Sequence, residues 1–262
     1  VLAERNQRNQ HGGGLIIQVH HLARMPKRDL DRIRPLYQQS AASQLELDNA
    51  IASYESAAAD VVVIAIKPYQ IESVIKPIAD EFAKNGRFVV SIAAGWDLAK
   101  YQKLFGDLAQ SIHIQCTIPN TPMAVGKGVL VTETDNTLTD MQTEVFELLF
   151  GPISLIERVD TAHMTIAMVV AGCAPAFTDM YIEALGDAGV QYGLQRATAY
   201  RLAAKMVEGV GALYMATGTH PGAMKDAVCS PGGTTIVGVA ELERKGFRGA
   251  VIDAVDAIQN KK

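Results

Sequence analysis

The chain has 262 residues, of which 48% are hydrophobic and 20% are charged, a composition typical of a globular protein with one large or two smaller domains. Its formal net charge of -4 argues against a nucleic-acid-binding protein that relies on a basic surface. We expect a cytoplasmic protein without membrane or metal partners. No apolar stretch is long enough and free enough of charge to span a membrane, the start lacks a signal-peptide pattern, and the three cysteines are far apart.

The first two thirds of the chain alternate short β-branched runs with longer segments of helical spacing. Strands are predicted, in chain order, at residues 15–20, 61–66, 87–92, 111–116 and 128–132. Helices are predicted at residues 27–37, 69–84 and 97–105. Because strands that alternate with helices favour βαβ units, we predict a Rossmann-like α/β domain with a doubly wound sheet over residues 1–159.

The beginning of the chain departs from the pattern of a dinucleotide-binding domain. Such a domain opens with a strand, a GxGxxG turn and a helix. No GxGxxG precedes Leu15, and residues 1–10 resemble the tail of a helix that a glycine-rich loop connects to the next strand. The simplest account is that the first strand and its phosphate-binding loop are missing from this sequence.

From about residue 160 the composition shifts toward alanine, methionine and glycine, and the spacing of apolar residues becomes helical. Helices are predicted at residues 163–170, 176–192, 197–216, 235–245 and 249–259. We therefore predict an all-helical second domain over residues 160–262. A long helix rich in alanine and methionine serves either as plain core or as a dimer interface, and the sequence alone leaves both open.

A glycine-rich loop, Ser230–Thr235 (SPGGTT), directly precedes one of these amphipathic helices. Its glycines would let a ligand approach the backbone, while the free N–H groups and the dipole of the helix favour an anion. Thr234 or Thr235 is expected to cap the helix. A small carboxylate is a natural ligand for this loop, although a capping turn that binds nothing fits the six residues equally well.

Four further segments are rich in small or turn-forming residues. Ala65–Pro68 (AIKP) and Ser91–Gly95 (SIAAG) end two predicted strands, and Pro119–Pro122 (PNTP) follows a third. Gly172–Phe177 (GCAPAF) is predicted to interrupt the helical part with small residues. Open α/β sheets bind ligands at the carboxyl ends of their strands. Each segment is a weak signal by itself, whereas their order and spacing along the chain are specific.

Together with SPGGTT, these segments resemble the motifs of the pyrroline-5-carboxylate reductase family, from Leu15 to near the end of the chain. The resemblance implies an N-terminal Rossmann domain and a helical C-terminal dimerisation domain that interleaves with a partner chain. It implies homodimers that commonly assemble further. It also implies reduction of the cyclic imine Δ1-pyrroline-5-carboxylate to L-proline by hydride transfer from NADPH, or from NADH, in proline biosynthesis.

The resemblance further assigns residues to the cofactor. Those that would border the nicotinamide and its ribose are Ala65, Ile66, Lys67, Pro68, Ala93, Ala94, Gly95 and Asn120. Asn49 would contact the adenosine end. Arg24 either pairs with the 2′-phosphate of NADPH or is a solvated surface charge.

For the substrate, the resemblance implies that Gly232, Gly233 and Thr234 hold the carboxylate through backbone N–H groups, with Ser230 shaping the loop. Thr235 is the catalytic candidate, because its hydroxyl would lie near the imine nitrogen and could orient it or relay a proton.

Five positions depart from the family motifs. Cys173-Ala174 stands in place of Ser-Gly, Phe177 in place of tyrosine, Cys116 in place of arginine and Met206 in place of threonine. Because each lost polar partner in a buried site costs about 1–3 kcal/mol, these departures leave open whether the activity is reduced or altered.

Two alternatives therefore stay beside the leading hypothesis of a pyrroline-5-carboxylate reductase. One is a reductase of another small imino or 2-oxo acid, against which the SPGGTT loop argues. The other is a non-catalytic dimeric scaffold or regulatory protein. Cofactor binding separates the two classes, because a reductase requires NAD(P)H and a scaffold does not.

Overall fold

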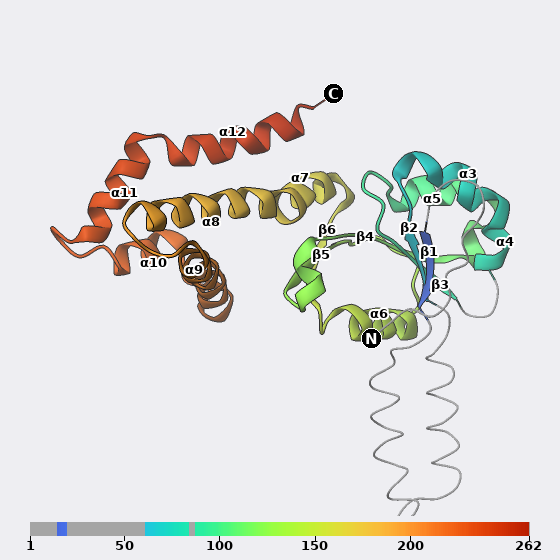
Figure 1. Ribbon diagram of the computed structural model, residues 1–262. Coiled ribbons are helices and arrows are strands. Elements are labelled where there is room, and N and C mark those ends of the chain that lie inside the picture. The colour runs from blue at the N-terminus through green and yellow to red at the C-terminus, as the bar shows by residue number, and fades with distance from the viewer. Residues whose placement is uncertain (1–14, 20–60, 84–86, 262) are drawn as a thin grey trace, which may run out of the picture. The chain divides into compact units, whose positions relative to one another are not determined.

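The computed structural model describes residues 15–19, 61–83 and 87–261 (Figure 1). The helix predicted at residues 27–37 lies outside the described residues. The chain divides into two compact units, Val1–Gly172 (unit 1) and Cys173–Lys262 (unit 2). Each unit is described by itself.

Unit 1 is built on a mixed sheet that, within the described residues, has six strands in chain order. The strands are β1 (Leu15–Val19), β2 (Val61–Ala65), β3 (Phe88–Ser91), β4 (His113–Pro119), β5 (Gly128–Glu133) and β6 (Ser154–Val159). Strands β2, β3 and β4 run parallel, β5 is antiparallel to β4, and β6 is parallel to β5. Strand β1 is antiparallel to β2. An apolar run predicts a strand but not its direction, so the mixed pairing could not be foreseen.

Helices cover both faces of this sheet (Figure 1). Because successive residues of a strand point to opposite faces, Ile64 and Val89 pack against one group of helices, while Phe88 and Leu130 pack against another. The helices on the first face are α3 (Ile71–Ile75), α4 (Ala79–Phe82) and α5 (Leu98–Phe105). The second face is covered by α6 (Asp140–Phe150). The result is a sheet between two helical layers.

The prediction of one continuous helix over residues 69–84 was wrong. Short 3-10 turns at Pro68–Gln70 and Lys76–Ile78 flank and separate α3 and α4. Pro77 has no N–H to donate to the carbonyl group of Ser73, so the regular α-helical ladder breaks there.

Two elements of unit 1 were missed from the sequence. Helix α6 begins with a capping box in which the Thr139 hydroxyl accepts from the backbone of Gln142 and the Gln142 side chain accepts from the backbone of Thr139. This Thr-x-x-Gln spacing was a usable signal in the sequence. Strand β6 has only one buried residue, the polar Ser154, so no run of buried apolar side chains marked it as a strand.

The segment Gly172–Phe177 does not interrupt the helical part, contrary to expectation. Helix α7 (Met164–Met168) continues through a π-helical turn at Val169–Cys173 into α8 (Ala174–Gln191). Pro175 lies in the first turn of α8, where the missing N–H of proline is tolerated.

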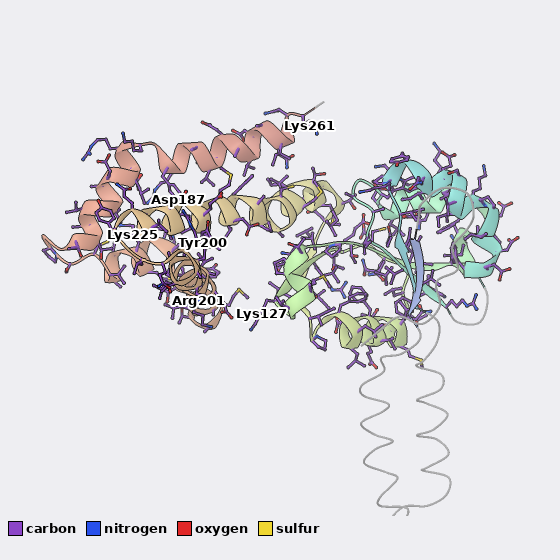
Figure 2. The ribbon with its side chains drawn as sticks, in the orientation of Figure 1. Lys127, Asp187, Tyr200, Arg201, Lys225 and Lys261 are labelled. Carbon is purple, nitrogen blue, oxygen red and sulfur yellow. The ribbon has the colours of Figure 1, made fainter. Side chains whose placement is uncertain are left out.

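Every regular element in the described residues of unit 2 is a helix. After α8 come α9 (Arg196–Thr217), α10 (Pro221–Ala227), α11 (Thr234–Arg244) and α12 (Phe247–Gln259). Helices α8 and α9 approach closely, because a Cβ atom added to Gly186 would lie 2.2 Å from Cε1 of Tyr200. Arg196 of α9 joins the two helices by an ion pair with Asp187 of α8, and within α9 it donates a hydrogen bond of 3.2 Å to the Tyr200 hydroxyl. Asp187 and Tyr200 are labelled in Figure 2.

Large apolar side chains of unit 2 are left exposed within the chain. Its buried residues, among those described, are the small Gly186, Ala199 and Ala203. A stripe along α9 at helical spacing is exposed instead: Leu202, Met206, Val210 and Leu213. A unit of this size without a core of its own needs apolar surface from elsewhere to be stable.

The expectation that no apolar stretch is long enough and free enough of charge to span a membrane was wrong. The helical run Thr161–Gln191 is long and apolar enough to cross a membrane. Only 6% of its most apolar stretch is buried. A helix whose apolar face is covered by a second protein chain passes the same test of length and composition.

Candidate active site

Two of the predicted cofactor segments lie side by side at the carboxyl edge of the parallel strands. Ile64 near the end of β2 is paired with Ser91 at the end of β3, so the residues that follow each strand emerge together. The indole N–H of Trp96 donates a hydrogen bond of 3.1 Å to the carbonyl oxygen of Pro68. This bond ties the turn after β3 to the AIKP segment after β2.

The two segments present small, accessible groups at this edge. Ala94 and Gly95 are exposed, whereas Ala93 is buried beneath them. Gly95 has φ 80°, a left-handed conformation that favours glycine, and a Cβ atom there would meet nothing within 4 Å. Lys67 is exposed at the end of β2. A flat ring or a ribose therefore finds open backbone and a cationic side chain here.

A buried hydroxyl pair supports the turn after β3 from below. The hydroxyls of Ser91 and Tyr101 share a hydrogen bond of 2.7 Å, and the N–H of Ala93 donates to the Ser91 hydroxyl at 3.3 Å. Burial raises the pKa of Tyr101 well above its usual range, so the phenol stays neutral. The role of this pair is to hold the turn.

Asn120, predicted to border the nicotinamide ribose, has its side-chain amide engaged within unit 1. Its oxygen accepts from the N–H of Val129 at 2.8 Å, and its nitrogen donates to the carbonyl of Ala171 at 2.9 Å. Ala171 lies in the π-helical turn, where the helical bonding pattern changes. Asn120 thus links the turn after β4 to the helix that begins at α7.

A cavity of about 330 Å³ opens beside Ala94 and Gly95. Its other walls include the side chains of Ile118, Met164 and Met168, and Glu133 lines it too. Glu133 is 1% exposed, and sequence reasoning missed it. A carboxylate that ends an apolar run such as Gly128–Glu133 was the available signal, because a buried charge requires partners.

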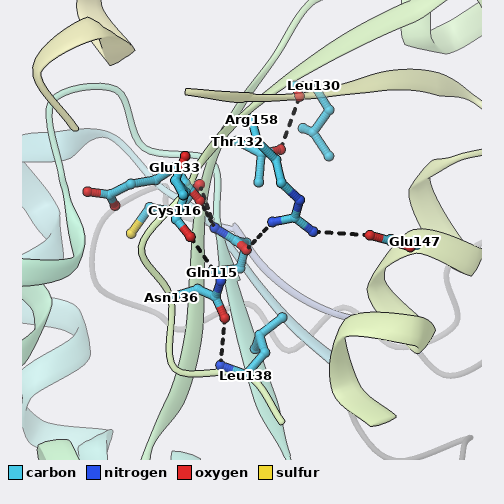
Figure 3. Close-up of polar contacts among 10 residues, drawn as sticks. Gln115, Cys116, Leu130, Thr132, Glu133, Asn136, Leu138, Glu147 and Arg158 are labelled. Carbon is cyan, nitrogen blue, oxygen red and sulfur yellow. Dashed lines mark hydrogen bonds and ion pairs between the residues drawn. The ribbon is translucent and has the colours of Figure 1, made fainter. Parts of the chain in front are cut away.

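Polar residues continue from Glu133 into the sheet (Figure 3). The side-chain nitrogen of Gln115 donates to the backbone oxygen of Glu133 at 2.7 Å, and the Gln115 oxygen accepts from Arg158 at 3.3 Å. Arg158 also pairs with Glu147 at 3.2 Å. Burial first, and then the charge of Glu133, raises the pKa of the Cys116 thiol well above its usual range. Cys116 is therefore a protonated core residue rather than a nucleophile.

In unit 2 the SPGGTT loop forms a tight turn before α11. The N–H of Gly233 donates to the carbonyl of Ser230 at 3.0 Å, and Gly232 has φ 68°. Proline followed by a left-handed glycine is the sequence pattern of a type II turn. The expected threonine cap was wrong: Gly233 is the N-cap without a side-chain bond, and Thr234 and Thr235 are the first two helical residues.

These two threonines are exposed at the start of α11, beside free backbone N–H groups of its first turn. The cofactor segments belong to unit 1 and this loop belongs to unit 2. Arg24 and Asn49 lie outside the described residues.

A Rossmann-like sheet with an open carboxyl edge is typical of dinucleotide-dependent oxidoreductases. In agreement, residues 16–95 match the family described as "NADP oxidoreductase coenzyme F420-dependent". Residues 161–262 match the family described as "Pyrroline-5-carboxylate reductase dimerisation".

Known proteins agree with both matches. A pyrroline-5-carboxylate reductase of Treponema pallidum is 46% identical over 197 residues, which cover 75% of this chain and 74% of that protein. The enzyme of the same name from Escherichia coli is 36% identical over 231 residues, or 88% of this chain and 83% of its own length. A crystal structure of Plasmodium falciparum pyrroline carboxylate reductase with NADP bound shares 29% identity at a TM-score of 0.66, covering 75% of this chain and 77% of that one.

The chain belongs to the pyrroline-5-carboxylate reductase family. This confirms the resemblance seen in the sequence, and it confirms the predicted pairing of a Rossmann-like domain with a helical dimerisation domain.

Proposed function

We propose that this chain reduces Δ1-pyrroline-5-carboxylate to L-proline with NAD(P)H, as a step of proline biosynthesis. The observation that carries the proposal is the edge where the Trp96–Pro68 hydrogen bond holds AIKP and SIAAG side by side. Membership of the reductase family supports the same activity. We further propose that residues 1–159 bind the dinucleotide and residues 160–262 bind the substrate and the partner chain.

The residues at the strand edge fit a nicotinamide and its ribose. The backbone at Ala94 and Gly95 is open, and Lys67 offers a cation beside it. We assign the same cofactor to Ala65, Ile66, Pro68, Ala93 and Asn120, and to Asn49 and Arg24 outside the described residues. A bound nicotinamide supplies the hydride for the reduction. We propose NADPH as the main cofactor, with NADH as the alternative.

The substrate site is assigned to the loop before α11. Of the backbone N–H groups assigned to the carboxylate, those of Gly232 and Thr234 would hold it at the positive end of the helix dipole, because the Gly233 N–H donates to Ser230 within the turn. The turn bond between Gly233 and Ser230 keeps these groups in one orientation. Thr235, the second residue of the helix, would orient the imine nitrogen through its hydroxyl or relay a proton to it. A protonated imine is electrophilic already, so positioning supplies much of the rate acceleration.

The matched dimerisation domain makes the chain a homodimer or a larger oligomer. The exposed stripe along α9 is the kind of surface that such association covers. We propose that dimers assemble further, that the protein is cytoplasmic, and that it binds neither nucleic acid nor a membrane.

Replacement of Thr235 tests the proposed chemistry. We expect Thr235→Ala to lose turnover while it keeps its fold and its NADPH affinity, and Thr235→Ser to recover much of the loss because it keeps the hydroxyl. Steady-state kinetics with the cyclic imine and circular dichroism measure both. Wild-type turnover in Thr235→Ala would remove this residue from the mechanism. Failure of the wild type to bind NADPH would favour a non-catalytic scaffold instead.

A further inference from the structure

Glu133 is the most deeply buried carboxylate beside the proposed cofactor edge, within the part of the chain that the structure describes. Its side chain is nearly inaccessible at the end of β5, where it lines the cavity next to Ala94 and Gly95. A buried carboxylate is costly to the fold unless hydrogen bonds satisfy its oxygens. Each of its two oxygens has a donor from a different element.

The first oxygen is bound by the helix that follows the SIAAG turn. The N–H of Leu98, the first residue of α5, donates to Glu133 Oε2 at 2.9 Å. Asp97 caps the same helix by accepting from the N–H of Lys100 at 2.8 Å. Between them the two carboxylates fix where the helix begins, and hence where the exposed turn before it ends.

The second oxygen is bound by the segment that leads into α7. The hydroxyl of Thr161 donates to Glu133 Oε1 at 2.5 Å. Met164 and Met168 of α7 form the apolar wall of the same cavity. One carboxylate therefore joins the turn at Ala94–Gly95 to the opposite wall, from positions 35 residues and 28 residues away in the chain.

We propose that Glu133 is a positioning residue for the cofactor: its two oxygens bridge the first turn of α5 and Thr161, and thereby set the distance between the SIAAG turn and α7. This inference rests on the proposed function, because it assumes that a nicotinamide binds against that turn. The bridge acts through the backbone and not through contact with reacting atoms. Its loss weakens cofactor binding more than it slows the chemical step.

Three variants that remove different parts of the Glu133 bridge should differ in their affinity for NADPH. Glu133→Ala removes both acceptors, and we expect the Kd for NADPH to rise about fivefold, which corresponds to about 1 kcal/mol. Glu133→Gln keeps one oxygen for the Leu98 N–H, and its amide can donate to the Thr161 hydroxyl, so we expect a Kd within about twofold of wild type. Thr161→Val removes a single donor at an exposed position, and we expect a rise of about two- to threefold that Thr161→Ser reverses.

The measurement is NADPH fluorescence titration of the full chain, paired with kcat at saturating NADPH. Glu157→Ala, a carboxylate removed from an exposed position on β6, is the matched control and should keep the wild-type Kd. Supporting results are a raised Kd in Glu133→Ala with kcat within about twofold of wild type, and recovery in Glu133→Gln. If Glu133→Ala fails to fold, the variants Thr161→Val and Thr161→Ser test the same bridge.

The inference is overturned if Glu133→Ala, or Thr161→Val where the former does not fold, matches Glu157→Ala in Kd. It is also overturned if Glu133→Gln is as impaired as Glu133→Ala. A wild type that binds NADPH without reducing the cyclic imine would contradict the proposed function alone, and the titrations would still decide the role of Glu133.

Discussion

Gly233→Ala should damage the substrate loop through one specific overlap. A Cβ atom at Gly233 would lie 2.4 Å from Oγ of Ser230 and 3.1 Å from its carbonyl oxygen. Favourable van der Waals contacts lie near 3.5 Å, so the added Cβ atom would overlap the Ser230 hydroxyl by about 1 Å. The carbonyl is held by the turn bond to the Gly233 N–H, so the hydroxyl must move or the turn must open. Overpacking of this kind costs about 2 kcal/mol, and we expect kcat/KM for the cyclic imine to fall about 30-fold.

A double-mutant cycle with Ser230→Ala isolates that overlap. Without the hydroxyl, only the milder contact with the carbonyl oxygen remains, so Gly233→Ala should cost about fivefold in the Ser230→Ala background. Gly232→Ala is the matched control. Its Cβ atom meets nothing within 4 Å and its cost comes from φ 68° alone, so the cost should be the same in both backgrounds. An equal loss from Gly233→Ala in both backgrounds would refute the steric argument.

Three further predictions concern unit 1. Asn120→Ala removes the bonds to Val129 and Ala171, and urea titration should show a free energy of unfolding lower by about 2 kcal/mol; an unchanged value would contradict the linking role. Trp96→Phe removes the hydrogen bond to the Pro68 carbonyl, so the Kd for NADPH should rise about fivefold in a fluorescence titration. Wild-type affinity in this variant would argue against the edge formed by AIKP and SIAAG as the cofactor site. Burial raises the pKa of both Cys116 and Tyr101, so the folded state keeps protons that the unfolded chain releases above the ordinary values of 9.0 and 10.0. Stability should therefore be complete below about pH 9 and fall as the pH rises further, with a shallower decline in Cys116→Ala; a flat urea midpoint would contradict this.

The apolar pattern of the sequence was sufficient to predict much of the sheet and the edge at which we propose that the cofactor binds. Val61–Ala65 is a continuous β-branched run, and its strand ends at the AIKP segment as expected. Residues after parallel strands gather at one edge, so the neighbourhood of Lys67 and Ala94 followed from local signals alone.

The remaining features depend on contacts between distant residues. Glu133 contacts Leu98 and Thr161 only in the folded chain, and the local sequence Gly128–Glu133 does not predict those partners. The antiparallel direction of β1 and the π-helical turn at Val169–Cys173 are likewise set by packing rather than by local propensity.

The central claim is tested most directly by NADPH oxidation, followed spectrophotometrically, with the purified chain and Δ1-pyrroline-5-carboxylate, and with NADH in parallel. The account predicts turnover that depends on the cyclic imine, faster with NADPH than with NADH, and little turnover with a small 2-oxo acid. A folded, dimeric protein that oxidises neither cofactor in the presence of the imine would contradict it.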